Sequence, residues 1–308
     1  MSVLALLLAL ALQAPPAVPA RAGTLVLAGE SFELEAPLAR ELAGSAAHLV
    51  LDLDGDAPDP LARSDSKGLR PDLSGDWGAS REAELLPLLE QSGAIVLQAR
   101  TWLSCWKHLK PEQKDSRLEQ ELRAALRAGR TLVATGAAAS YCASWSLVSR
   151  EEIHRAQRNP RSEDPNLVVT GLDFARGWML DTSTESASGA ARVVRAAQHF
   201  GSNRALFLQG PVAWIVREGA PQAQITGSGF AAVFDLSHAR RSRGELREGR
   251  MLLLREGDQL RIGKRLELLP GQAPSAAEPD WKRLALPFEP VRAAGSGREY
   301  RFDWLAQR

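Results

Sequence analysis

The sequence predicts an α/β fold: a doubly wound, mostly parallel sheet with helices on both faces, followed by C-terminal antiparallel strands and hairpins. Short apolar runs alternate with helix-like segments up to Val216, a pattern typical of parallel sheets covered by helices. After Val216 the runs are separated by glycine and charged residues, which favours hairpins. The chain has 308 residues, 44% hydrophobic and 24% charged, and this composition excludes a disordered or collagen-like protein.

Residues 1–22 predict a signal peptide. Val3 to Leu12 are apolar and uncharged, and a stretch of small residues follows and ends in Ala20-Arg21-Ala22. We therefore expect export to the periplasm or to the outside of the cell. Because this apolar run is too short to cross a bilayer core of about 30 Å, we expect no membrane insertion after cleavage.

Residues 23–236 are expected to form the α/β domain. Its predicted strands are short apolar runs: Thr24 to Ala28, His48 to Leu53, Ala94 to Leu97, Thr131 to Thr135, Leu167 to Val169 and Ala205 to Leu208. The clearest helix begins after a Ser116-x-x-Glu119 capping box and ends near Gly129. Residues 56–81 are rich in Asp, Ser, Gly and Pro, and predict a long loop over the carboxyl ends of the strands, where such folds bind ligands.

Residues 237–308 are expected to form a strand-rich extension that packs on the same domain. Antiparallel strands are predicted on both sides of this boundary, at Ala223 to Thr226, Phe230 to Leu236, Met251 to Arg255 and Arg265 to Leu269. The segment from Gly271 to Arg308 reads as a linker followed by a strand that packs back.

The segment from Thr131 to Leu147 has the order of a nucleophile elbow. Such an elbow needs a strand that turns sharply into a helix, with small residues beside an exposed nucleophile. Thr131 to Thr135 predicts the strand, Gly136 to Ala139 supplies small residues, and Ser140 to Leu147 predicts the helix. The turn itself lacks Ser and Cys. Ser140 and Cys142 follow about one helical turn later, where packing is favoured over nucleophilic attack.

The order of elements resembles the cyanophycinase and peptidase E group of serine peptidases. The resemblance rests on weak matches in order and spacing: Gly23 to Gly29, Leu42 to Leu51, Gly171 to Phe174 ahead of Asp181, Ala205 to Val216, Gly229 to Asp235 and Leu252 to Leu260. It implies a domain like that of class I glutamine amidotransferases, with the active serine at an elbow.

The resemblance also implies a degenerate active site. The family's Gly-Thr-Ser-Ala-Gly-Ala falls on Ala134 to Ala139, so Gly136 takes the serine position. Ser183 takes the place of the histidine and Gly210 that of the acidic residue, while the oxyanion-hole glycines fall on Gln98 and Ala99. Because nucleophile, base and acid are all replaced, we expect an inactive pseudopeptidase that acts as a binding or structural module.

Two alternatives stay open. One is an active hydrolase in which Ser140 or Cys142 is a relocated nucleophile. The other is a protein that binds acidic or amide-rich peptides through Arg100, Lys107 and Arg176 without cleaving them. His154 and His199 are expected to be surface or capping residues rather than bases. Four tryptophans near the expected cleft either pack or line a pocket: Trp102, Trp106, Trp145 and Trp178.

Charge and metal-ligand spacing point to no further ligand. With 38 Lys and Arg against 37 Asp and Glu, the formal charge is +1, and without a long basic run we expect no nucleic-acid binding. The carboxylates from Asp52 to Asp59 alternate as in a calcium loop, but Ala57 and Arg63 occupy the positions of the glycine and the bidentate glutamate. We expect neither a metal nor a cofactor.

The two cysteines leave two interpretations open. In an oxidising compartment Cys105 and Cys142 form a disulfide; alternatively, both are small buried thiols. The pattern indicates no particular oligomeric state.

Overall fold

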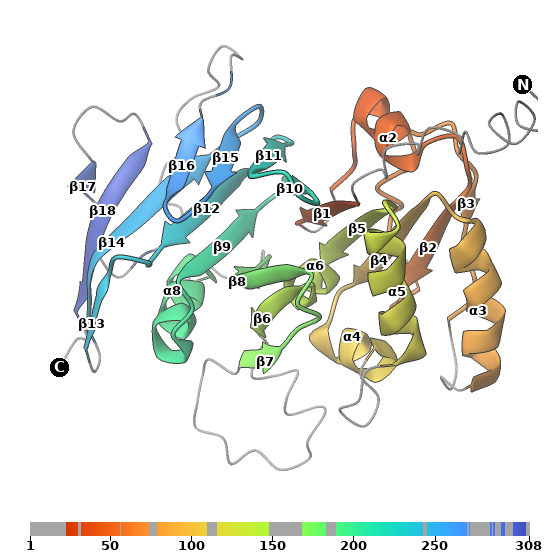
Figure 1. The fold of residues 1–308 in the computed structure, drawn as a ribbon, viewed down its shortest axis with the longest axis horizontal. Coiled ribbons are helices and arrows are strands. Elements are labelled where there is room, and N and C mark those ends of the chain that lie inside the picture. Colours follow the sequence, from red (N-terminus) through yellow and green to blue (C-terminus); the bar gives the residue numbers. More distant parts are fainter. Residues whose placement is uncertain are drawn as a thin grey trace, which may run out of the picture.

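Two large mixed sheets and a set of helices make up the computed structural model (Figure 1). It describes residues 23–29, 32–55, 57–73, 79–109, 116–147, 168–182, 189–242, 245–269, 271, 284, 286, 291–292 and 298–305. The first sheet has the order β16 (Leu266–Leu269), β15 (Gln259–Ile262), β11 (Gln222–Thr226), β10 (Ala213–Arg217), β1 (Thr24–Ala28), β5 (Thr131–Gly136), β4 (Ala94–Ala99), β2 (His48–Asp52) and β3 (Gly68–Leu69).

The second sheet contains the remaining strands of the described residues. Its order is β17 (Val291–Arg292), β18 (Glu299–Leu305), β14 (Glu245–Leu254), β12 (Phe230–Asp235), β9 (Arg204–Gln209), β8 (Ala175–Asp181), β6 (Ala143–Leu147) and β7 (Val168–Thr170), and β13 (Arg240–Ser242) pairs with β14. Pairing is parallel from β1 through β5, β4 and β2 to β3, and again from β6 through β8 to β9. The other strand pairs of the described residues are antiparallel, such as β1 with β10 and β9 with β12.

The α/β class is confirmed, but the prediction of one mostly parallel sheet is wrong. The prediction fails because an apolar run indicates a strand but does not determine which strand it pairs with or in which direction. β1 pairs in parallel with β5 on one side and antiparallel with β10 on the other, although β10 lies far along the chain. That long-range pairing joins hairpin strands to the parallel strands.

All ten predicted strand runs overlap strands of the structure, and one predicted helix is wrong. β1, β2, β4, β5, β7, β9, β11, β12, β14 and β16 overlap the expected runs. Ser140 to Leu147 is not a helix, because the helix ends at Tyr141 and β6 covers Ala143–Leu147. There the apolar Ala143, Trp145 and Leu147 alternate with two serines, which is the period of a strand.

The helices lie against both sheets (Figure 1). They are α2 (Ala36–Ala43), α3 (Ala79–Gln91), α4 (Trp102–Leu109), α5 (Arg117–Arg127), α6 (Ala137–Tyr141) and α8 (Gly189–Phe200). The cap predicted for α5 is confirmed: Ser116 Oγ accepts a 3.0 Å hydrogen bond from the backbone N–H of Glu119. The expected loop over residues 56–81 is interrupted by β3 and ends where α3 begins.

The core follows the two-residue period of the strands. On β1, Leu25 and Leu27 belong to the cluster shared with the second sheet, whereas Val26 and Ala28 belong to the cluster that includes Leu42 of α2. A third cluster covers the other face of the second sheet beneath α8. Burial on both faces of the first sheet explains why β1, β2, β4 and β5 are mostly apolar along their length.

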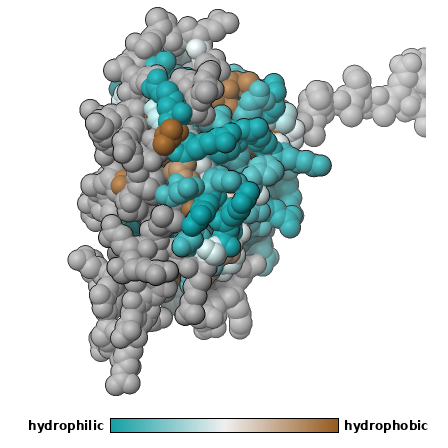
Figure 2. All heavy atoms as spheres, turned by 90° about the vertical axis from the view of Figure 1, so that its left-hand side faces the viewer, coloured by the Kyte–Doolittle hydropathy of each residue, from teal (hydrophilic) through white to brown (hydrophobic). Residues whose placement is uncertain are grey.

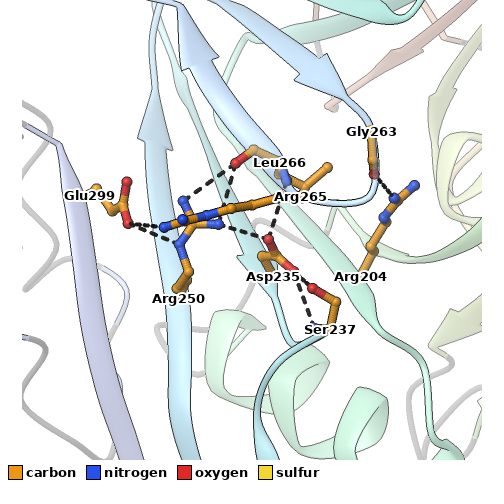
Figure 3. A network of polar contacts seen from close by, with 8 residues as sticks. All are labelled: Arg204, Asp235, Ser237, Arg250, Gly263, Arg265, Leu266 and Glu299. Atoms are coloured by element: carbon orange, nitrogen blue, oxygen red, sulfur yellow. Dashed lines mark hydrogen bonds and ion pairs between the residues drawn. The ribbon is translucent and has the colours of Figure 1, made fainter.

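A buried polar network ties the two sheets together (Figure 3). Arg250 of β14 donates 2.9 Å hydrogen bonds to Asp235 of β12 and to Glu299 of β18, and it also donates to the backbone oxygen of Leu266 on β16. Asp235 in turn accepts from the Leu266 N–H at 3.3 Å. Because Asp235 and Arg250 are almost fully buried, their charges are satisfied by one another and by the backbone.

The outer side of the second sheet is polar. The side of Figure 1 that carries β13 and β14 faces the viewer in Figure 2, and it is mostly hydrophilic over the described residues. Exposed ion pairs there join Arg240 to Glu248 and Arg247 to Glu245. Such pairs are screened by water, so their contribution to stability is small.

Strands from both sides of residue 236 share the two sheets, since β14 pairs with β12 and β15 with β11. The division into 23–236 and 237–308 stays a prediction. The predicted signal peptide lies outside the described residues. Within the described part of the chain, no helix combines the length and apolarity needed to span a membrane.

Candidate functional site

The turn between β5 and α6 has the shape expected of an elbow. β5 ends at Gly136 and α6 begins at Ala137, with Gly136 at φ 60° and ψ −135°. A positive φ with this ψ lies in a region that residues with a side chain rarely adopt. Ala138 and Ala139 are fully buried behind the turn, and their small side chains allow α6 to pack closely on the strands. The residue at the tip of the turn carries no nucleophilic atom.

Two hydroxyl groups fill the space beside this turn. Thr182 Oγ1 donates a 2.8 Å hydrogen bond to the carbonyl of Gly136, and Ser140 Oγ lies 3.2 Å from Thr182 Oγ1. Because Thr182 has a single hydroxyl proton, Ser140 must be the donor in the second bond. The proton of Ser140 therefore points to a neutral hydroxyl rather than to a base. Thr182 was not identified from the sequence as a residue of this site. Its position directly after Asp181 is the feature of the sequence that could have indicated it.

Cys142 follows α6 and is buried, as is Cys105 on α4. Neither cysteine forms a disulfide, so the structure favours the interpretation of two small buried thiols. Burial raises the pKa of the Cys142 thiol far above its usual range. The reactive thiolate is thereby disfavoured, and neither Ser140 nor Cys142 has the surroundings of a nucleophile.

The end of β8 carries an ion pair instead of a base. Asp181 is buried and accepts a 2.8 Å hydrogen bond from Arg192 in the first turn of α8. Ser183, at the position of the family's histidine, lies outside the described residues, as does His154. His199 lies about 10 Å further along α8 than Arg192 and packs edge-on against Phe200.

Gln98, Ala99 and Gly210 help to hold the fold together. Gln98 and Ala99 match the oxyanion-hole glycines of the family, and Gly210 matches its acidic residue. Ala99 pairs with Gly136 across β4 and β5. Gln98 is buried and donates its side-chain amide to the backbone oxygen of Pro58 at 2.6 Å, which fastens the loop after β2 to β4. Gly210 has φ 74°, and a Cβ atom on the neighbouring Gly29 would overlap its carbonyl oxygen. Glycine at 29 thus permits close packing where the chain crosses between the sheets.

The three predicted binding cations come from separate segments. Arg100 follows β4 and is exposed, and its backbone N–H donates to Asp54 Oδ2 at 2.5 Å. Lys107 lies exposed on α4. Arg176 of β8 is almost fully exposed and pairs with Asp173 at 3.8 Å. All three are exposed, but their common role in binding stays a prediction.

The carboxylates considered for calcium bind neighbouring protein groups. Asp52 accepts from the backbone N–H groups of Asp54, Gly55 and Ala57, which closes the turn after β2. Asp54 accepts from Ser104 Oγ on α4 at 2.6 Å as well as from the backbone beyond β4. Asp56 lies outside the described residues. The described residues contain no group of three His, Cys, Asp or Glu side chains arranged to hold a metal.

The tryptophans divide between surface and core. Trp102 and Trp106 stack on α4 with ring centroids 5.9 Å apart, and both are partly exposed. Trp178 packs edge-on against Trp214 at 4.5 Å inside the core, so it lines no open surface. Trp145 packs against Phe200.

A comparison with solved structures finds a peptidase fold. The crystal structure of a peptidase from an acI-B1 Actinobacterium superposes with a TM-score of 0.50, covering 79% of this chain and 98% of that one at 13% identity. No family model and no curated protein sequence matches the chain. At this identity the likeness concerns the fold: an α/β protein with a peptidase-like architecture.

Proposed function

We propose that this chain is an exported relative of the cyanophycinase and peptidase E serine peptidases that has lost the catalytic site of that family and uses the peptidase scaffold to bind peptides. The observation that carries the proposal is the turn at Gly136. It has the backbone of an elbow but no hydroxyl or thiol at its tip. Without a nucleophile, acyl transfer at this position has no covalent step.

The surroundings of the turn support the same interpretation. Thr182 and Ser140 form a neutral hydrogen-bonded chain that ends on the Gly136 carbonyl, so their polar groups are used internally. Arg192 neutralises Asp181 at the end of the neighbouring β8. The exposed cations Arg100, Lys107 and Arg176 favour acidic or amide-rich peptides as ligands.

The relocated-nucleophile hypothesis finds no favourable contact. Ser140 donates to a hydroxyl, and the thiol of Cys142 is buried with a raised pKa. An active enzyme of this kind would need a base within hydrogen-bond reach of one of these atoms.

The proposal is tested by treating the purified mature protein with a fluorophosphonate and with iodoacetamide, mapping adducts by mass spectrometry, and assaying hydrolysis of aspartyl dipeptides. We expect no adduct at Ser140 or Cys142 and no dipeptide hydrolysis. Thermal shift with aspartyl and arginyl peptides then tests binding, since a ligand selective for the native state raises the melting temperature. An adduct at Ser140, or dipeptide turnover abolished by Ser140→Ala or Cys142→Ala, would overturn the proposal.

A further inference from the structure

A second cluster of polar side chains lies at the other end of the parallel strands. His48 is the first residue of β2. It pairs with Ala94, the first residue of β4, and Ala94 in turn pairs with Thr131, the first residue of β5. Gly136 is the last residue of β5, so the two positions are about 16 Å apart along the strand direction. The chain between β2 and β3 brings Asp59 and Ser66 to His48.

The three side chains form one continuous hydrogen-bonded series. Ser66 Oγ lies 2.7 Å from His48 Nδ1, and His48 Nε2 lies 2.7 Å from Asp59 Oδ2. His48 is 1% exposed, so its imidazole is shielded, whereas Ser66 is only half-buried. A hydroxyl on a half-buried serine, a shielded imidazole and a carboxylate follow one another, which is the order of groups in an activated serine.

The contacts of Asp59 determine which nitrogen of His48 carries the proton. Burial raises the pKa of Asp59, but the hydrogen bonds from His48 and from the Leu61 N–H outweigh it and keep the pKa below its usual value. Asp59 is therefore an acceptor, and Nε2–H must be the donor to it. In the neutral imidazole Nδ1 then accepts the proton of Ser66, which is the arrangement a general base requires. The 2.8 Å bond from Leu61 N–H to the other carboxylate oxygen fixes Asp59 in place.

We propose that Ser66 is a nucleophile and that Ser66, His48 and Asp59 form a separate esterase site for small activated esters. Ser66 Oγ attacks the ester carbonyl while its proton passes to His48 Nδ1. The tetrahedral adduct then expels the alcohol, which takes that proton. Water attacks the acyl-serine with His48 again receiving and returning the proton, and this releases the acid and restores Ser66. Asp59 is a positioning residue. Activated esters fit because their alcohols leave with little protonation.

Ser64 provides a matched control. Its Oγ lies 2.7 Å from Ser66 Oγ on the same turn, and it is half-buried like Ser66. His48 Nδ1 makes its 2.7 Å contact with Ser66 Oγ. Both serines are therefore half-buried, and they differ in the contact of Ser66 with the imidazole.

The experiment compares adduct formation and ester hydrolysis in the full mature chain. A fluorophosphonate should label Ser66, and hydrolysis of p-nitrophenyl acetate should fall at least about tenfold in Ser66→Ala and His48→Gln but not in Ser64→Ala. Asp59→Asn should lower kcat and leave KM unchanged. Labelling of Ser66 leaves the proposed peptide-binding function intact, whereas labelling of Ser140 alone overturns both proposals.

Thiol variants keep the test decisive if His48 variants fail to fold. In Ser66→Cys the imidazole should promote the thiolate, so iodoacetamide should alkylate it at least about tenfold faster than the thiol of Ser64→Cys. Circular dichroism confirms that both variants are folded. Equal alkylation rates in the two variants, or a wild-type protein unlabelled at Ser66, would show that the cluster only fastens the loop to β2.

Discussion

The hydroxyl of Thr182 donates a 2.8 Å hydrogen bond to the backbone carbonyl of Gly136, and this bond ties the end of β8 to the turn after β5. Gly136 ends β5 of the first sheet and Thr182 directly follows β8 of the second, so the bond also links the sheets at the candidate site. Ser140 donates to the same Thr182 oxygen. A buried side chain thus replaces solvent at the carbonyl of the turn.

Thr182→Val keeps the shape of the side chain and removes its hydroxyl. The Gly136 carbonyl and the Ser140 hydroxyl would lose their partner in a buried place, so the free energy of unfolding should fall by about 1–3 kcal/mol. Urea unfolding measures the change. Thr170→Val, at an exposed position of β7, is the control and should stay within about 0.5 kcal/mol of wild type. Equal effects of the two substitutions would contradict the buried hydrogen bond.

Gly136→Ala tests the strained backbone of the turn. Because Gly136 has φ 60° and ψ −135°, a Cβ atom there should cost about 1–3 kcal/mol of unfolding free energy. Gly263→Ala is the control, because a Cβ at Gly263 meets its nearest atom at an ordinary 3.5 Å. Urea unfolding of both variants gives the comparison. A Gly136→Ala protein as stable as wild type would mean that the turn relaxes away from the elbow.

The sequence predicted those parts of the fold that depend on neighbours in the chain. β1 and β5 were predictable because every residue in them is buried, and the start of α5 because Ser116 and Glu119 cap it locally. β8 was missed, because Arg176 and Gly177 interrupt its apolar residues. The turn at Gly136 could be predicted because strand, glycine and helix follow one another.

Contacts between distant segments could not be predicted in this way. His48, Asp59 and Ser66 meet because the chain between β2 and β3 returns to the start of β2, and no periodic pattern in the sequence indicates this return. Arg250 and Glu299 are 49 residues apart and meet because β14 pairs with β18. Such pairs follow from strand order, and strand order depends on long-range packing.

Cys142 should be unreactive in the folded protein. Burial raises the pKa of its thiol, and Cys105 is fully buried as well, so neither presents an accessible thiolate. Ellman's reagent should detect no thiol in the native protein and both after unfolding in guanidinium chloride. Cys105→Ser and Cys142→Ser assign any partial reaction to one residue. Fast reaction of Cys142 in the native protein would restore the relocated-nucleophile hypothesis.

Arg250 should be far more important for stability than an exposed arginine in an ion pair. Arg250→Met leaves the buried carboxylate of Asp235 without its cation, which should cost about 3–5 kcal/mol of unfolding free energy. Arg261→Met is the matched control, because Arg261 and its partner Glu267 are both about half-exposed. This second change should cost about 0–1 kcal/mol. Similar losses in urea unfolding would show that the network in Figure 3 does not join the sheets as described.

The carboxylates of the same network make the protein sensitive to acid. The hydrogen bond from Arg250 lowers the pKa of Glu299 below its ordinary 4.5, despite partial burial. Burial raises the pKa of Asp235, but the hydrogen bonds from Ser237 and the Leu266 N–H and the charge of Arg250 outweigh it, so its pKa lies below 3.8. When the native pKa is the lower one, the unfolded chain binds more protons than the native protein at acid pH.

The contribution of these two carboxylates to the free energy of unfolding should therefore be complete above their ordinary pKa values of 4.5 and 3.8. It should be lost as the pH falls below those values toward the lower pKa values of the native protein. Urea unfolding between pH 7 and pH 3 measures this slope. Glu299→Gln removes one titrating group while keeping an acceptor oxygen for Arg250, so its stability should fall less steeply below pH 4.5 than that of the wild type. Glu267→Gln, which changes an exposed carboxylate, is the control and should keep the wild-type slope. If Glu299→Gln loses stability as steeply as the wild type, Glu299 does not contribute to the acid sensitivity.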